Sequence, residues 1–296
     1  MSVDPKLQSS WDSVLEKVKR YYPDADFEIL KKAFEFARTY HGSQKRSSGE
    51  AYIFHPVAVA DILAELQLDV YSIATGLLHD TVEDCDTNVG EVENQFGKEI
   101  ALLVDGVTKL SKVKFKSSHE KQAENFRKML LAMAQDLRVI LVKLADRTHN
   151  MRTLSHLKAE KQMRISQETL DIYAPLANRL GISWMKSELE DLSLKYLHPE
   201  TYQKLSALIA QKKHEREEYI NKMLQLIGEK INNYGLEVNV TGRAKHFYSI
   251  FKKMETQKID FNEIHDIVAF RVITKKISEC YEVLGIVHSF FKPVPG

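Results

Sequence analysis

Along most of the chain, apolar residues recur every three or four positions. The spacing of Phe27, Leu30 and Phe34 is an example, and turn signals are sparse from about residue 5 to residue 230. This period places apolar side chains on one face of a helix. We therefore expect residues 5–230 to be almost wholly helical.

Local signals predict where some of these helices begin and end. Asn88 can cap a helix, and Glu91, three residues later, would complete a capping box. Pro175 should kink or end a helix, and Gly181 should terminate the next one. The charged run from 199 to 232 is predicted to form one extended helix.

The pattern changes after Gly235. The next segments alternate in polarity, then show helical spacing, then become apolar and β-branched, which predicts a strand, a helix and a strand for residues 236–242, 245–255 and 266–274. We place a domain boundary near 195 to 200. The expected parts are 1–197, a connecting helical region 198–234, and a smaller α/β part 235–296.

Composition narrows the possible partners and compartment. The chain has 42 Lys and Arg against 41 Asp and Glu, so no global field favours nucleic acid or a membrane surface. The two cysteines, Cys85 and Cys280, fit neither a disulfide framework nor a cysteine zinc site. No stretch approaches the length of a membrane span. We expect a cytoplasmic protein that binds neither membranes nor nucleic acid.

The segment GLLHDTVED, residues 76–84, places a histidine and acids directly after a predicted buried helix. Asp69 can cap that helix, so His79 and Asp80 should lie near its buried end. A buried, unpaired carboxylate is costly, and a cation would relieve that cost. The His-Asp dipeptide alone carries little weight, because it recurs at 265–266.

Two further segments offer matching ligands. YIFHPVAVADIL places His55 at a proline-started helix, and VILVKLADRTHNMRTL places Asp146 after an apolar run. Two imidazoles and two carboxylates suit Mn²⁺, Fe²⁺, Co²⁺ or Zn²⁺ in an open site. The candidate ligands are His55, His79, Asp80 and Asp146. Taken singly, His55 could instead stabilise a helix start, and Asp146 could pair with a nearby arginine.

Two acids follow the His-Asp pair at helical spacing. Glu83 lies four residues after His79, and Asp84 four after Asp80, so a continuing helix would place them one turn further along the same face. There they could accept a proton or orient the nucleophile. The alternative, a helix end solvated by acids, predicts that Glu83→Gln leaves activity unchanged.

A basic, serine-rich turn precedes His55. In HGSQKRSSGEAYIFHP, Arg46 can grip a phosphate or stack on a base, and Ser47 and Ser48 can bond phosphate oxygens. An ordinary surface turn uses the same residue types. The lysine-rich segment 108–122 is either a basic loop beside an anion site or a solvated loop.

These motifs resemble a known family in order and spacing. RSSGEAYIFHP, GLLHDTVED, GVTKL, KLADRTHNMRTL and YAPLANRLGI resemble the hydrolase half of the RelA/SpoT homologues, enzymes that make and degrade (p)ppGpp. TGRAKHFYSIFKKM and EIHDIVAFRVIT resemble the opening of their synthetase half. The resemblance implies a mostly α HD-domain helical bundle, followed by a partial α/β, nucleotidyltransferase-like synthetase domain.

The resemblance also implies roles in the hydrolase half. In the family the metal, usually Mn²⁺, is held by residues matching His55, His79, Asp80 and Asp146. Residues matching Glu83 and Asp84 activate water, and the nucleotide is surrounded by residues matching Arg46, Ser48, Asn150 and Thr153. The implied reaction removes the 3′-pyrophosphate of (p)ppGpp and leaves GDP or GTP.

In the synthetase half the resemblance implies an incomplete site. Residues matching the family's ATP-binding run are Arg243, Lys245, His246, Ser249 and Lys253, and Asp266 matches its Mg²⁺ ligand. Family members continue beyond PVPG into the segment that binds the guanine acceptor, so we expect synthetase activity to be lost. Full-length relatives act with the ribosome, but we expect no direct nucleic-acid contact here.

Three alternatives stay open at this point. The chain could be a general HD nucleotide phosphohydrolase, which would show no advantage for ppGpp over other nucleotides. It could be an ATP:GTP/GDP 3′-pyrophosphotransferase that uses Arg243, Lys245 and Asp266. It could also be a nucleotide-sensing module without turnover.

Overall fold

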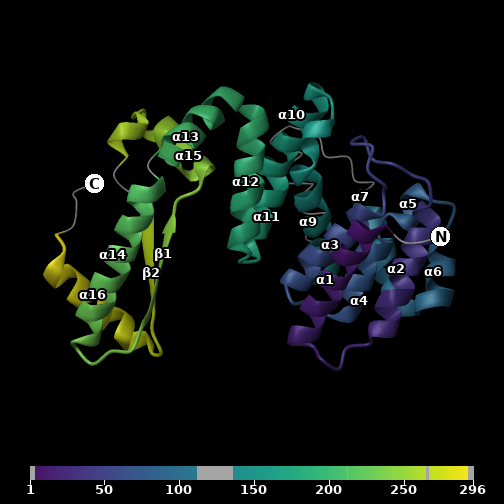
Figure 1. Ribbon diagram of the computed structural model, residues 1–296, viewed down its shortest axis with the longest axis horizontal. Helices are drawn as coiled ribbons and strands as arrows, with labels where there is room; N and C mark the ends of the chain where they lie inside the picture. The colour runs from purple at the N-terminus through teal and green to yellow at the C-terminus, as the bar shows by residue number, and fades with distance from the viewer. Residues whose placement is uncertain (1–3, 112–135, 212, 265–266, 293–296) are drawn as a thin grey trace. The chain divides into compact units, whose positions relative to one another are not determined.

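The structure is a computed structural model that describes residues 4–111, 136–211, 213–264 and 267–292. The chain divides into two compact units, Met1–Leu197 and His198–Gly296. Most of the described residues are helical, and the second unit also contains a small sheet (Figure 1). The predicted fold class, mostly α with a small α/β part, is confirmed.

The first unit is helical in its described residues, as predicted. Its elements are α1 (Pro5–Tyr21), α2 (Phe27–His41), α3 (Phe54–Glu65), α4 (Val70–Leu78), α5 (Thr81–Asp84), α6 (Val89–Phe96), α7 (Lys98–Ser111), α9 (Leu137–Arg152), the 3-10 turn η1 (Leu154–His156), α10 (Ala159–Glu168), the π-helical turn η2 (Thr169–Tyr173), α11 (Ala174–Arg179) and α12 (Ser183–Leu197).

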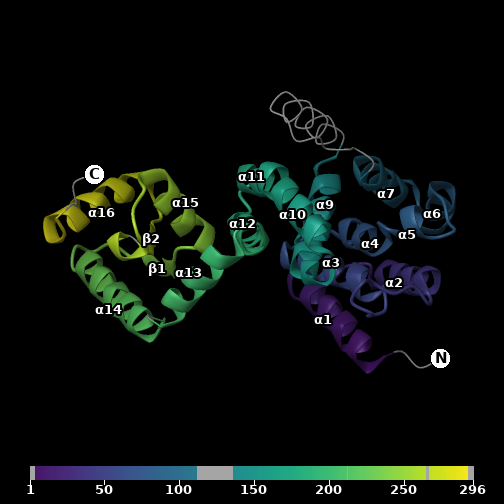
Figure 2. The same ribbon diagram turned by 90° about the horizontal axis from the view of Figure 1, so that it is seen from above.

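Helices α3, α4 and α9 contact one another in the first unit (Figure 2). Leu63 of α3 and Leu77 of α4 are fully buried in its core. A Cβ added at Gly76 would lie 2.5 Å from Cδ1 of Leu63, so the glycine permits the close approach of α4 to α3. This packing fixes the relative positions of the helices from which the candidate ligands come.

The predicted caps form, with one difference. The Asp69 carboxylate accepts from the N–H groups of Tyr71 and Ser72 and begins α4. Asn88 accepts from the Glu91 N–H at 3.1 Å, as expected. The Glu91 carboxylate instead accepts from the hydroxyls of Tyr40 and Thr87. A tertiary contact therefore takes the acid that would have completed the capping box.

Pro175 lies just after a change of helix type. Helix α10 runs into the π-helical turn η2, and α11 then begins with Pro175 as its second residue. A proline ring clashes with the carbonyl four residues earlier in a regular helix, and a widened π turn relieves that clash. The helix path changes without a sharp end. Gly181, with φ +76°, follows α11 as predicted.

The second unit contains the predicted strand, helix and strand. Strands β1 (Asn239–Ala244) and β2 (Val268–Ile273) pair antiparallel, with Asn239 opposite Ile273. Helix α16 (Ile277–Phe290) and α14 (Lys213–Asn232) pack over one sheet face (Figure 1). The remaining elements are α13 (Pro199–Gln211), α15 (Phe247–Gln257) and the 3-10 turn η3 (Phe261–Glu263).

The structure describes helix on both sides of residue 212, in α13 (Pro199–Gln211) and α14 (Lys213–Asn232). Residue 212 itself lies outside the described residues, so one extended helix over 199–232 stays a prediction. The two described stretches pack on different elements, α13 on α15 and α14 on β1 and α16. The functional division into 1–197, 198–234 and 235–296 stays a prediction.

One sequence interpretation falls mostly outside the described residues, and another can be compared with the described helices. Most of the lysine-rich segment lies in 112–135, outside them. Among the helices that the structure describes, none has the length and apolar character needed to cross a membrane.

Candidate metal centre

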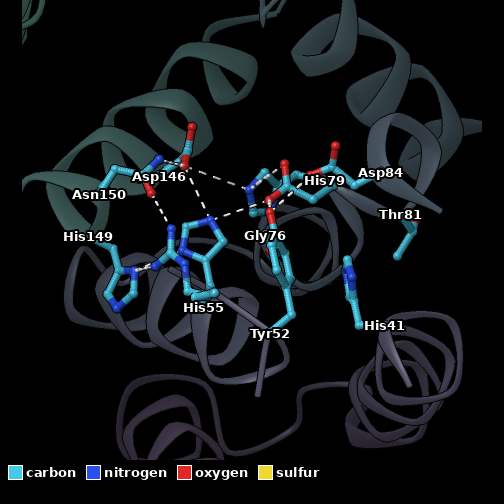
Figure 3. Close-up of polar contacts among 12 residues, drawn as sticks. His41, Tyr52, His55, Gly76, His79, Thr81, Asp84, Asp146, His149 and Asn150 are labelled. Atoms are coloured by element: carbon cyan, nitrogen blue, oxygen red, sulfur yellow. Dashed lines mark hydrogen bonds and ion pairs between the residues drawn. The ribbon is translucent and has the colours of Figure 1, made fainter. Parts of the chain in front are cut away.

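Three packed helical segments bring four of the predicted residues together. Figure 3 labels three of them, His55, His79 and Asp146. His55 lies in the first turn of α3, and His79 and Asp80 form the turn between α4 and α5. Asp146 lies in α9, on the buried side of the helix. The convergence follows from the packing of α3, α4 and α9 against one another.

The four side chains face one small space. His55 Nε2 lies 3.4 Å from Asp80 Oδ2 and 3.3 Å from Asp146 Oδ1. His79 Nε2 lies 3.1 Å from Asp80 Oδ1 and 3.9 Å from Asp146 Oδ1. Ligand atoms of His55, His79 and Asp80 are all within 4.8 Å of one another. The set that the sequence predicted is therefore assembled, and its binding of a metal stays a prediction.

The hydrogen bonds of His79 fix its tautomer. Nδ1 lies 2.8 Å from the Gly76 carbonyl oxygen, which can only accept, so Nδ1 carries the hydrogen. The lone pair of the neutral ring is then on Nε2. That buried nitrogen makes no hydrogen bond to any part of the chain that the structure describes. When it carries no proton, Nε2 of His79 therefore directs its electron pair into the space between the two carboxylates.

His55 has the same tautomer as His79, with the hydrogen on Nδ1, for a different reason. Arg46 has only donors, and its Nη1 lies 3.1 Å from Nδ1 of His149, so that nitrogen must accept. Nδ1 of His55 lies 2.7 Å from the same atom and must therefore donate. The lone pair of His55 is left on Nε2, which faces Asp80 and Asp146.

The electrostatics of this cluster fit a bound cation. The imidazoles of His55 and His79, each 1% exposed, converge with two carboxylates. Buried electron-rich groups this close together need compensating positive charge. Burial alone would lower the pKa of His79, but the Asp80 carboxylate raises it to about 9. A proton and a divalent cation thus compete for Nε2. The mix of imidazole and carboxylate ligands suits Mn²⁺, Fe²⁺, Co²⁺ or Zn²⁺.

Lys143 supports the centre and was missed by the sequence analysis. Its Nζ lies 2.7 Å from Oδ2 of Asp146, which leaves Oδ1 facing the histidines. Burial would lower the pKa of Lys143, but Asp146 raises it above its usual range, so the lysine stays charged. The spacing of three residues on a helix was the available signal.

The Lys143→Met variant should be destabilised by about 3–5 kcal/mol when no metal is added, because Asp146 is left as an uncompensated buried charge. Mn²⁺ would supply that compensation, so its addition should raise the melting temperature more in the variant than in the unaltered protein. Thermal unfolding with and without Mn²⁺ measures this. Lys109→Met, at an exposed pair with Asp105, is the matched control. Equal Mn²⁺ effects in all three proteins would contradict the prediction.

Tyr52 connects the candidate metal ligands to a candidate proton acceptor. Its hydroxyl lies 2.8 Å from Oδ2 of Asp80 and 3.0 Å from Oδ2 of Asp84. Its ring stacks on His41 with centroids 4.6 Å apart. Burial and Asp80 raise the pKa of Tyr52 above its usual range, so the phenol keeps its hydrogen. An aromatic residue beside an apolar helix gave no sequence signal of this contact.

The expectation of a helix continuing past His79 is wrong. Helix α4 ends at Leu78 and α5 begins at Thr81. The His79 ring bonds to the Gly76 carbonyl, and the Thr81 hydroxyl donates to the Leu78 carbonyl at 2.7 Å. Side chains thus take the carbonyls that a continuing helix would use. After this break, Asp84 lies beside Tyr52, and Glu83 is exposed on α5.

Three of the four predicted nucleotide-binding residues contact one another. Arg46 Nη2 lies 2.5 Å from Oδ1 of Asn150, and its Nη1 lies 3.3 Å from Oγ1 of Thr153. Arg46 comes from the turn before α3, and the other two come from the end of α9. Ser48 is exposed in that turn, where its hydroxyl accepts from the Glu50 N–H.

The predicted ATP-binding residues lie at the junction of β1 and α15. Arg243 is exposed on β1, Lys245 donates its N–H to the Ile267 carbonyl at 2.8 Å, and His246 directly precedes α15. Ser249 and Lys253 lie on α15. Asp266 lies outside the described residues. The ATP-binding role of this group stays a prediction.

Comparison with known families matches both parts of the chain. Residues 33–183, just over half of the chain, match the model of the HD domain. Residues 242–296 match the model of a region found in RelA and SpoT proteins. A solved structure described as a metazoan ortholog of SpoT that hydrolyzes ppGpp covers 62% of this chain and 95% of its own at 24% identity, but its TM-score of 0.38 is too low to carry an argument.

Curated relatives are much more similar. The GTP pyrophosphokinase of Myxococcus xanthus is 57% identical over 97% of this chain and 39% of its own length. The bifunctional (p)ppGpp synthase/hydrolase SpoT of Escherichia coli K12 is 48% identical over 97% of this chain and 41% of its own. A probable guanosine-3′,5′-bis(diphosphate) 3′-pyrophosphohydrolase of Synechocystis is 52% identical over 90% of this chain and 35% of its own. The chain thus spans about two fifths of the length of these relatives, and it belongs to the HD-domain proteins of the RelA/SpoT family.

Proposed function

We propose that this chain is a Mn²⁺-dependent hydrolase that removes the 3′-pyrophosphate of (p)ppGpp and yields GDP or GTP and pyrophosphate. The observation that carries the proposal is the convergence of two imidazole lone pairs and two carboxylates at a buried site. The names of the E. coli and Synechocystis relatives, which act on guanosine bis(diphosphate), support the choice of substrate.

The residues around the centre have different roles in the proposed reaction. His55, His79, Asp80 and Asp146 would hold the cation, which when bound supplies positive charge at the reacting phosphate and acidifies water. Asp84 lies 3.0 Å from the Tyr52 hydroxyl that also contacts Asp80 and would accept the proton of the attacking water. Glu83 is adjacent on α5 and serves as the second acid.

The cluster of Arg46, Asn150 and Thr153, called the arginine cluster below, is suited to bind the nucleotide. The planar guanidinium of Arg46 can bind a phosphate with two parallel hydrogen bonds or stack on a base. Asn150 and Thr153, which it contacts, offer an amide and a hydroxyl at the end of the helix that carries Asp146. Nucleotide binding at this cluster would place the scissile phosphate beside the metal ligands.

The cytoplasm is the compartment that we infer for this reaction. The two cysteines are free in the structure, which suits a reducing compartment. The substrate is a small guanine nucleotide, and neither nucleic acid nor a membrane takes part in the proposed reaction.

Chromatography of the products tests the proposal. Protein, ppGpp and Mn²⁺ should give GDP and pyrophosphate, and a chelator should abolish both. Intact ppGpp in the presence of Mn²⁺ would indicate a sensing module, and release of orthophosphate would contradict the assigned bond. Equal rates across a panel of other nucleotides would favour a general phosphohydrolase.

Pyrophosphate transfer from ATP to GDP or GTP is the second candidate, favoured by the name of the Myxococcus relative. Incubation of the same chain with ATP, GDP and Mg²⁺ tests it separately. Formation of ppGpp in this assay would establish the transfer activity.

A further inference from the structure

His149 lies between the arginine cluster and the candidate metal centre. It occupies α9 three residues after Asp146, with its ring centroid 4.9 Å from that of His55. Its Nδ1 is 2.7 Å from Nδ1 of His55 and 3.1 Å from Nη1 of Arg46. Nδ1 of His149 therefore contacts two donors, the candidate metal ligand His55 and the candidate nucleotide-binding residue Arg46. Figure 3 shows His149 beside His55.

That nitrogen has one lone pair to share between the two donors. The Arg46 guanidinium cannot accept, so it donates, and His55 must also donate from Nδ1. A lone pair shared between two donors bonds each more weakly than it would bond one alone. The strength of the His55 hydrogen bond thus depends on the position of Arg46.

The His55 hydrogen bond matters for metal binding. A metal-binding histidine usually donates its other ring N–H to a partner that orients the ring and raises its basicity. Here that partner is His149, whereas for His79 it is the Gly76 carbonyl. If a nucleotide draws Arg46 away, His149 accepts from His55 alone, and Nε2 of His55 becomes the stronger ligand.

We propose that His149 is a positioning residue that couples nucleotide binding at Arg46 to metal binding at His55, an inference that rests on the proposed function. Because coupling between two binding events is reciprocal, metal bound at His55 also loosens Arg46 from His149 and favours the nucleotide. The two ligands therefore bind with positive cooperativity, and Asn150 and Thr153 retain the arginine near the site when it leaves His149.

A cycle of variants measured with Mn²⁺ alone tests the coupling. Mn²⁺ affinity of the full chain is measured by calorimetry and by the loss of the free-ion paramagnetic resonance signal. Arg46→Met removes one donor to His149, and His149→Phe removes the shared acceptor. His149→Asn keeps an acceptor oxygen at about the position of Nδ1. Lys45→Met removes an exposed positive charge from the same turn and controls for charge alone.

The expected pattern is specific. His149→Phe weakens Mn²⁺ binding by roughly 10-fold to 100-fold, and His149→Asn restores most of the loss. Arg46→Met tightens Mn²⁺ binding by about 3-fold to 10-fold in the unaltered protein, beyond any effect of Lys45→Met. The gain is smaller in the His149→Asn background, because the amide oxygen has two lone pairs for the two donors. In the His149→Phe background this extra gain disappears. Circular dichroism establishes that each variant is folded.

Two results overturn the proposal in distinguishable ways. If Mn²⁺ binds but Arg46→Met changes its affinity equally in the unaltered and His149→Phe backgrounds, the coupling is wrong and the proposed hydrolase stands. If Mn²⁺ does not bind the unaltered protein at all, the proposed metal centre and the coupling both fall.

Discussion

The Asp80→Asn variant should lose Mn²⁺ binding, and its rate of ppGpp hydrolysis should fall by about 10³-fold or more. Asp80 supplies one of the two negative charges of the centre, with oxygens 3.1 Å from His79 Nε2 and 3.4 Å from His55 Nε2. A catalytic metal is worth several kcal/mol to the transition state, and each 1.36 kcal/mol is about tenfold in rate. Asparagine keeps the shape of the side chain but removes its charge.

The measurement pairs metal affinity with turnover. Calorimetry with Mn²⁺ and product chromatography are carried out on the same preparations. Asp105→Asn, at a half-buried acid of the first unit that pairs with Lys109, should leave both quantities unchanged. Retention of full activity in Asp80→Asn, with Mn²⁺ still bound, would exclude Asp80 as a ligand and with it the proposed centre.

The sequence predicted the helices of the first unit because their signals are local. An apolar period of three to four residues and a cap such as Asp69 act within one or two turns, so they can be read without knowing the fold. The four candidate ligands were found for a related reason. A histidine and acids beside apolar helix segments are costly unless they have a common partner.

The contacts that support those ligands were not predictable in the same way. Tyr52 and His149 belong to residue types that also occur at ordinary surface or core positions. Their roles depend on which helices pack together, since Tyr52 contacts Asp80 across 28 positions and Arg46 contacts His149 across 103. The sequence offers no period or spacing that encodes such separations.

The wrong prediction of helix continuity past His79 has a physical cause. Helix propensity alone favours continuation through this residue. There the side chains of His79 and Thr81 bond carbonyls of the helix. The loss of these backbone partners to side chains, rather than a glycine or proline, ends α4.

The acids on α5 should govern turnover without governing metal binding. Asp84→Asn and Glu83→Gln should each lower kcat for ppGpp by about 10²-fold to 10⁴-fold, the usual contribution of a general acid or base. Mn²⁺ affinity should change little, because the ligand set is completed by other residues. Asp84 should show the larger loss, since it lies 3.0 Å from the Tyr52 phenol oxygen that also contacts Asp80.

Asp86→Asn provides the matched control, because Asp86 is an exposed acid just beyond the same short helix. If the acids of this segment only solvate a helix end, all three substitutions should have the same small effect on kcat. A fall in kcat confined to Glu83 and Asp84, with Mn²⁺ affinity retained, instead requires that these carboxylates act on the attacking water. The same comparison separates the acids from Asp80, whose loss should remove the metal and the activity together.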